Sequence, residues 1–122
     1  MPASFLVPLI WLAASATLFA GFAGLLPRPL VSRILPLDTL EPAGWLFFRH
    51  WAVLVCLCGV LLVWAALDPV ARRPVLVLVA AEKAGFACLV FQHRATPIGR
   101  ALRGGAVADL LIALIFAASL PS

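Results

Sequence analysis

The chain has 122 residues, of which 65% are hydrophobic and 11% are charged, and its mean hydropathy is +1.14. A soluble domain of this length could not bury so much apolar surface, because small domains leave a large fraction of their surface in water. We therefore predict an integral membrane protein. The net charge of +4 reflects arginines that lie mostly between apolar segments, where membrane proteins keep them, so it does not indicate nucleic-acid binding.

The first apolar segment, residues 5–26, has about the ~20 residues that a helix needs to cross the hydrocarbon core. No lysine or arginine precedes it, so we expect a retained helix and not a cleaved signal peptide. Small residues recur at four-residue spacing in two rows, Ala13, Thr17, Gly21 and Ala16, Ala20, Gly24. Such rows let another helix backbone approach closely, and we predict that they are packing faces.

The connection that follows, residues 27–43, is rich in proline and arginine. Residues 30–35 are predicted to form a short turn at the membrane interface, with the arginines at the lipid headgroups. Asp38 or Thr39 is the predicted N-cap of the second helix.

Three further apolar segments predict three more membrane-spanning helices. The second helix is expected over residues 44–67 and ends at Asp68-Pro69. Arg72-Arg73-Pro74 is predicted to begin the third helix, residues 74–92, so that helices two and three form an antiparallel hairpin.

The fourth helix is expected over residues 105–120, which makes it the shortest span. Asp109, Ala113 and Ala117 share one of its faces, which predicts a narrow packing stripe with an acid at one end.

The predicted fold is therefore an up-down bundle of four transmembrane helices that forms a single domain over residues 1–122. The first and third connections hold more arginines than the second connection. By the positive-inside rule, we expect those two connections in the cytoplasm and both termini in the periplasm of a bacterial inner membrane.

Charged residues inside the predicted spans are the candidate functional groups. Glu82 and Lys83 lie roughly 13–15 Å into the bilayer by helical rise, where each carries an insertion cost of roughly 2.5–3.5 kcal/mol. Arg49 and Asp109 lie roughly 7–8 Å in from the same side. We predict that these four residues form one polar cluster inside the bundle, with His50 as a candidate fifth member. The alternatives are that Arg49 reaches the interface, that Asp109 faces the headgroups and that His50 bonds a carbonyl.

The predicted cluster has two open interpretations. It is either a permanent ion-pair network that fixes helix register, or the lining of a cavity that binds a polar head or carries protons.

The sequence contains no recognisable catalytic, cofactor-binding or metal-binding motif. There is no nucleotide-binding glycine loop, and the histidines and cysteines do not have metal-ligand spacing. Cys56, Cys58 and Cys88 all lie within apolar segments, where we interpret them as packing residues. We accordingly expect no cofactor and no metal.

A set of single residues resembles a known protein family. It comprises Phe48-Arg49 at the start of the second helix, Gly59, Asp68-Pro69 before a basic hairpin, the pair Glu82-Lys83, and Asp109 early in the fourth helix. Over residues 44 to 120 the chain resembles the small bacterial four-helix membrane proteins of the DoxX-like type. Some members of that group resemble membrane subunits of quinone-linked oxidoreductases, so the resemblance implies a quinone as one ligand class.

These features are compatible with three functions. The leading hypothesis is a non-enzymatic accessory or interaction subunit, whose small-residue faces dock in a homo-oligomer or on another membrane protein. The alternative is a binder or carrier of a lipid, quinone or other amphiphile that holds the polar head with the charged cluster. An intramembrane isomerase or redox enzyme that uses Glu82 or Asp109 as a proton donor is the third hypothesis.

Overall fold

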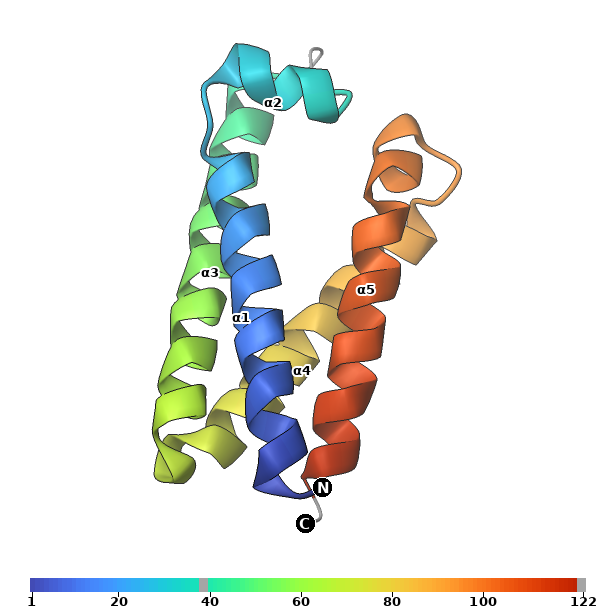
Figure 1. The fold of residues 1–122 in the computed structure, drawn as a ribbon. Coiled ribbons are helices and arrows are strands. Elements are labelled where there is room, and N and C mark those ends of the chain that lie inside the picture. Colours follow the sequence, from blue (N-terminus) through green and yellow to red (C-terminus); the bar gives the residue numbers. More distant parts are fainter. Residues whose placement is uncertain (38–39, 121–122) are drawn as a thin grey trace.

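The computed structural model describes residues 1–37 and 40–120 of the chain. The regular elements of this part are all helices, in the order α1 (Ala3–Gly24), α2 (Arg28–Ile34), α3 (Pro42–Leu67), α4 (Pro69–Gln92) and α5 (Pro97–Ser119) (Figure 1). The four long helices have 22, 26, 24 and 23 residues and are apolar enough to cross a membrane, so the predicted four-helix membrane bundle is confirmed. The short helix α2 lies across one end of the bundle, where an interfacial turn was predicted. The predicted N-cap at Asp38 or Thr39 lies outside the described residues.

The predicted start of the third span at Pro74 is wrong, because α4 begins at Pro69. The Asp68 carboxylate accepts a hydrogen bond from the backbone N–H of Val70 at 2.9 Å, which caps the helix. Pro69 then occupies the first helical position, where its missing N–H has no intrahelical partner to lose. Pro74 lies inside α4, and only Asp68 separates α3 from α4. The two helices pack on one another as the predicted hairpin requires.

The predicted start of the last span at residue 105 is also wrong, because α5 begins at Pro97. The Thr96 hydroxyl accepts a hydrogen bond from the backbone N–H of Gly99 at 3.1 Å and caps this helix. Gly104 and Gly105 lie within the helix and do not interrupt it. The last span is therefore as long as the others and is not the shortest.

Helices α1 and α3 pack closely through glycines. A Cβ atom on Gly21 would lie 2.8 Å from the backbone nitrogen of Cys56, and one on Gly59 would lie 2.6 Å from the Cγ atom of Leu18. All three residues of the first predicted row of α1, Ala13, Thr17 and Gly21, are buried, and Gly21 lies directly against α3. In the second row, Gly24 is buried whereas Ala16 and Ala20 are exposed. The glycines of α1 therefore serve the packing of helices within this chain.

The bundle consists of two arms. Helices α1 and α3 form the first arm, and α4 and α5 form the second arm, with α3 and α4 also in contact. Near Asp68 one apolar core joins all four helices and includes Ile10, Leu62, Val79 and Phe116. Towards α2 this core divides into two smaller clusters, one around Trp45 and one around Ala87. The arms are thus held together at one end and stand apart at the other (Figure 1).

Substitution of Gly21 by alanine tests the packing of the first arm. Its methyl group would meet the backbone of Cys56, which cannot move aside alone, so we expect a loss of about 1–3 kcal/mol in unfolding free energy. The matched control is Gly85→Ala on α4, where the methyl group enters open space and helix propensity favours alanine by up to about 1 kcal/mol. Thermal unfolding in mild detergent should lower the melting temperature only for Gly21→Ala. Equal melting temperatures for the two variants would contradict the close contact.

Candidate functional site

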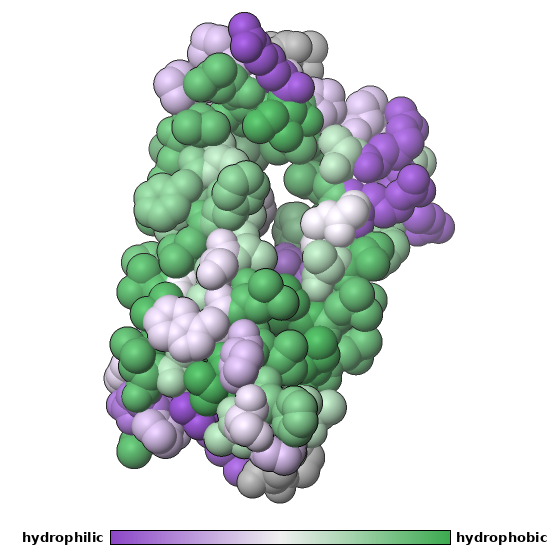
Figure 2. Space-filling view, viewed as in Figure 1, coloured by the Kyte–Doolittle hydropathy of each residue, from purple (hydrophilic) through white to green (hydrophobic). Residues whose placement is uncertain are grey.

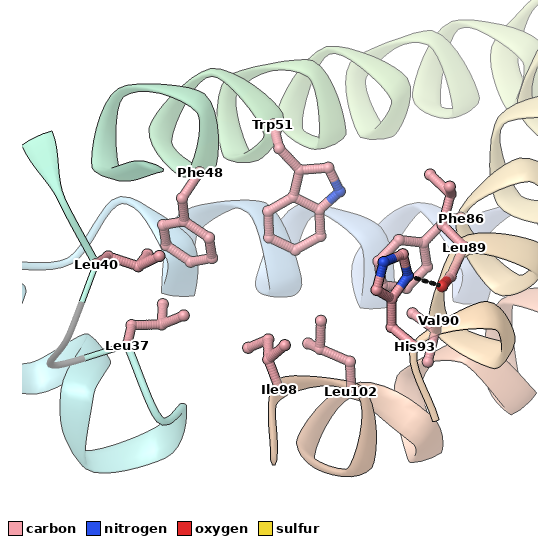
Figure 3. Close-up of a pocket in the computed structure, with 11 residues that line it drawn as sticks. Leu37, Leu40, Phe48, Trp51, Phe86, Leu89, Val90, His93, Ile98 and Leu102 are labelled. Atoms are coloured by element: carbon pink, nitrogen blue, oxygen red, sulfur yellow. Dashed lines mark hydrogen bonds between the residues drawn. The ribbon is translucent and has the colours of Figure 1, made fainter. Parts of the chain in front are cut away.

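A cleft with a volume of about 360 Å³ lies between the arms at the α2 end. Figure 3 shows the side chains that surround it, which come from the segment after α2, from α3, from α4 with its C-cap and from α5. The lining residues are Leu37, Leu40, Phe48, Trp51, Phe86, Leu89, Val90, His93, Ile98, Gly99 and Leu102. Apart from His93, every lining side chain is apolar. The Nδ1–H of His93 donates to the carbonyl oxygen of Leu89 at 2.8 Å, which holds the ring at the end of α4.

Aromatic rings from both arms form the walls of the cleft. The Phe48 and Trp51 rings of α3 have centroids 5.5 Å apart. Trp51 stacks on Phe86 of α4, with 5.7 Å between centroids and 26° between ring planes. The indole N–H of Trp51 is buried and has no hydrogen-bond partner within the described part of the chain. Flat apolar surfaces of this kind suit an aromatic, unsaturated or aliphatic ligand.

A smaller cavity of about 140 Å³ lies behind the cleft and shares Phe48, Trp51 and Leu102 with it. Its other walls are the end of α1 and α2. In the space-filling view an opening passes between the arms near α2, with apolar surface around it and hydrophilic surface just below it (Figure 2). The side chains of Phe48, Trp51 and Leu102 therefore separate the cleft from the smaller cavity.

Lys83 and Asp109 form an ion pair that joins the helices of the second arm. The Lys83 Nζ atom lies 2.9 Å from the Asp109 Oδ1 atom, and the Lys83 side chain is only 3% exposed. Asp109 is therefore a partner for the buried ammonium group and does not face the headgroups. The two groups neutralise one another inside the bundle, which makes their burial tolerable.

Glu82 is not one of the residues that line the cleft, but it lies on α4 just beyond Phe86. We call this end of the cleft, towards the middle of α4, its inner end. Glu82 precedes Phe86 by one helical turn and so shares the face of α4 that lines the cleft. The side chain is half-buried, and it makes no hydrogen bond or ion pair with any residue that the structure describes.

Arg49 does not join these groups, so the predicted four-residue cluster is wrong in this respect. Its guanidinium donates to the carbonyl oxygens of Gly24 at 2.8 Å and Leu26 at 2.5 Å, at the C-terminal end of α1. It also lies over the Trp45 ring, 5.3 Å from the centroid. A cation there bonds carbonyls that the end of the helix leaves unpaired.

The remaining predicted residues have separate positions. His50 is exposed and is not brought into the cluster. On α5, Ala113 is buried whereas Ala117 is exposed, so the stripe that begins at Asp109 is only partly used within the chain. Of the predicted cluster, the structure thus pairs Lys83 with Asp109, and Glu82 lies next to Lys83 in the chain without a hydrogen bond or ion pair to either.

Sequence reasoning missed the aromatic walls. The sequence pattern includes Phe48 only in the family resemblance, and it does not point to Trp51 or Phe86. A signal was present: Phe48 and Trp51 share one helical face, and Phe86 is one turn from Glu82. No pattern in the sequence indicates, however, that the two arms stand apart.

No model of a known protein family, no curated protein and no solved structure matches the chain. The resemblance to DoxX-like proteins therefore stays a prediction. The functional interpretation rests on the geometry of the cleft and on the charges beside it.

The Lys83–Asp109 pair can be tested by a double-mutant cycle. Lys83→Met alone leaves the Asp109 carboxylate without its cation inside the bundle, so we expect a loss of about 3–5 kcal/mol in unfolding free energy. The double variant Lys83→Met, Asp109→Leu removes both charges and should regain most of that loss. The measurement is thermal unfolding in detergent. Additive effects of the two substitutions would contradict a direct ion pair.

Proposed function

We propose that the protein binds a small amphiphile, with the apolar part of the ligand in the cleft between the arms and its polar end towards Glu82. The supporting observation is the cleft itself, which is lined almost wholly by apolar and aromatic side chains and ends one helical turn from an unpaired carboxylate. Its volume of about 360 Å³ falls in the range of small-molecule sites, about 300–1,000 Å³. A lipid or a quinone-like molecule matches this combination of apolar body and polar end.

One polar group beside the cleft favours a ligand over simple filling by acyl chains. The half-buried Glu82 carboxylate makes no hydrogen bond or ion pair with any residue that the structure describes. Unsatisfied polar groups are costly in a low-dielectric interior, so a molecule that supplies partners gains specificity there. Hydrocarbon chains supply none.

The cellular setting is part of the proposal. The end of the bundle that holds α2 and the cleft also holds Arg28, Arg33, Arg94 and Arg100, whereas Arg72 and Arg73 lie near the opposite end. We place the α2 end at the cytoplasmic face of a bacterial inner membrane, with both termini in the periplasm. The cleft then opens in the cytoplasmic leaflet.

Trp51→Ala tests this function. The substitution removes one wall of the cleft and the stacking contact with Phe86, so the variant should lose any amphiphile that co-purifies with the unaltered protein. The matched control is Trp11→Ala, because Trp11 is exposed on α1 and does not line the cleft. Native mass spectrometry and lipid analysis after gentle extraction provide the measurement. Identical ligand content in the two variants would contradict the proposal.

A second function, an accessory or interaction subunit, is favoured by a different surface. An apolar groove of about 290 Å³ lies between α1 and α5, with Leu12, Ala16, Ala108 and Leu111 among its lining residues. Small side chains along such a groove permit a helix of a second copy or of another membrane protein to approach.

Ala16→Leu fills this groove and should dissociate any complex that depends on it, as measured by native mass spectrometry. Ala118→Leu is the control, since Ala118 is exposed on α5 outside the groove. A monomer without partners in the unaltered protein would count against this second function.

A further inference from the structure

The groups near the inner end of the cleft do not balance in charge. Lys83 and Asp109 neutralise one another at 2.9 Å, and Arg49 is directed to the carbonyl oxygens of Gly24 and Leu26. Glu82 is the ionisable group left over. When it is ionised, the set Glu82, Lys83 and Asp109 has a net charge of −1 in a span that crosses hydrocarbon. An isolated charge at that depth is costly, and a cation bound beside Glu82 would stabilise its ionised form.

The side chains that line the cleft include one that can carry a positive charge, His93, which bonds the carbonyl oxygen of Leu89 at the end of α4. No lysine or arginine is among the residues that line the cleft. Arg28 lies over the Trp45 ring, 4.5 Å from its centroid, and donates to the carbonyl oxygen of Leu40. Arg94 and Arg100 donate to backbone carbonyls at the end of α4 and before α5. Arg28, Arg94 and Arg100 therefore bond main-chain oxygens.

The walls of the cleft also favour positive charge. The faces of Phe48, Trp51 and Phe86 carry negative electrostatic potential, and a cation over such a ring is attracted most when water is excluded. An anionic head would meet these faces and the Glu82 carboxylate, and both repel it. Charge complementarity thus selects one class of amphiphile.

We propose that the ligand is a lipophilic organic cation, such as a quaternary ammonium, a phosphonium or a protonated amine on an apolar body, and that Glu82 neutralises its charge. This inference rests on the proposed function and names its ligand class. The apolar groups of the cation occupy the cleft, and the charged centre lies at its inner end. The Lys83–Asp109 pair keeps the one nearby ammonium group occupied, so that Glu82 stays available.

The test uses the full-length protein in phosphatidylcholine nanodiscs with tritiated tetraphenylphosphonium as the probe. Two competitors differ in charge but share three phenyl rings: methyltriphenylphosphonium, which is a cation, and triphenylphosphine oxide, which is neutral. The cation should compete at a concentration lower by about tenfold or more. Glu82→Gln should weaken binding of tetraphenylphosphonium by a similar factor, whereas Glu41→Gln, an equal change of charge at an exposed position, should leave it unchanged.

The outcomes separate the ligand class from the proposed function. Equal competition by the cation and the neutral compound on the unaltered protein would overturn the cationic ligand, and this result does not depend on how Glu82→Gln folds. If that shared binding were still lost in Trp51→Ala, amphiphile binding in the cleft would stand. If Trp51→Ala left binding intact, or if neither compound bound the unaltered protein, both the cationic ligand and amphiphile binding in the cleft would be overturned.

Discussion

Ionised side chains inside a bilayer need partners, and the ways in which this chain provides them determine its architecture. Lys83 and Asp109 hold α4 against α5 by a direct ion pair. Arg49 bonds the last carbonyl oxygens of α1, and Arg72 donates to the carbonyl oxygen of Ala65 near the end of α3 at 3.0 Å. Each of these contacts fixes one helix against another. Glu82 is the exception, and it lies where the two arms separate.

The separation of the arms follows from unequal packing. In the first arm, glycines on α1 and α3 allow the backbones to approach closely, and a larger residue at Gly21 or Gly59 would clash. The arms share a common core only near Asp68, where a single residue links α3 to α4. Towards α2 each arm has a core cluster of its own, and the arms meet there through a few side chains only, such as the Trp51–Phe86 stack and Ile98 of α5 against the Trp45 cluster. The cleft is therefore a consequence of how the core divides, and the proposed ligand completes a surface that the protein leaves open.

Much of the fold could be predicted from the sequence because long apolar segments and small-residue rows are local signals. The four spans, the short interfacial element and the buried packing of Ala13, Thr17 and Gly21 follow from such signals. The sequence pattern predicts the starts of α4 and α5 several residues too late. Pro74 and the pair Gly104-Gly105 are typical of helix boundaries, but the two helices begin earlier, at the side-chain caps Asp68 and Thr96.

The candidate site could be predicted only in part. Depth in the membrane groups the charged residues in one leaflet, but it does not give the direction of a side chain around its helix. Because α5 begins at Pro97, Asp109 lies deeper than a start at residue 105 predicts, and it pairs with Lys83. Arg49 instead turns to α1, where its guanidinium bonds carbonyl oxygens that the end of the helix leaves unpaired. The cleft depends on the spacing of two arms, which is a property of tertiary packing.

The most direct test of the account is an experimental structure of the protein extracted gently from its native membrane. The account predicts an ordered molecule between Phe48, Trp51 and Phe86, with its polar end in contact with the Glu82 carboxylate. A closed cleft in which Glu82 pairs with a cation of the protein itself would contradict it.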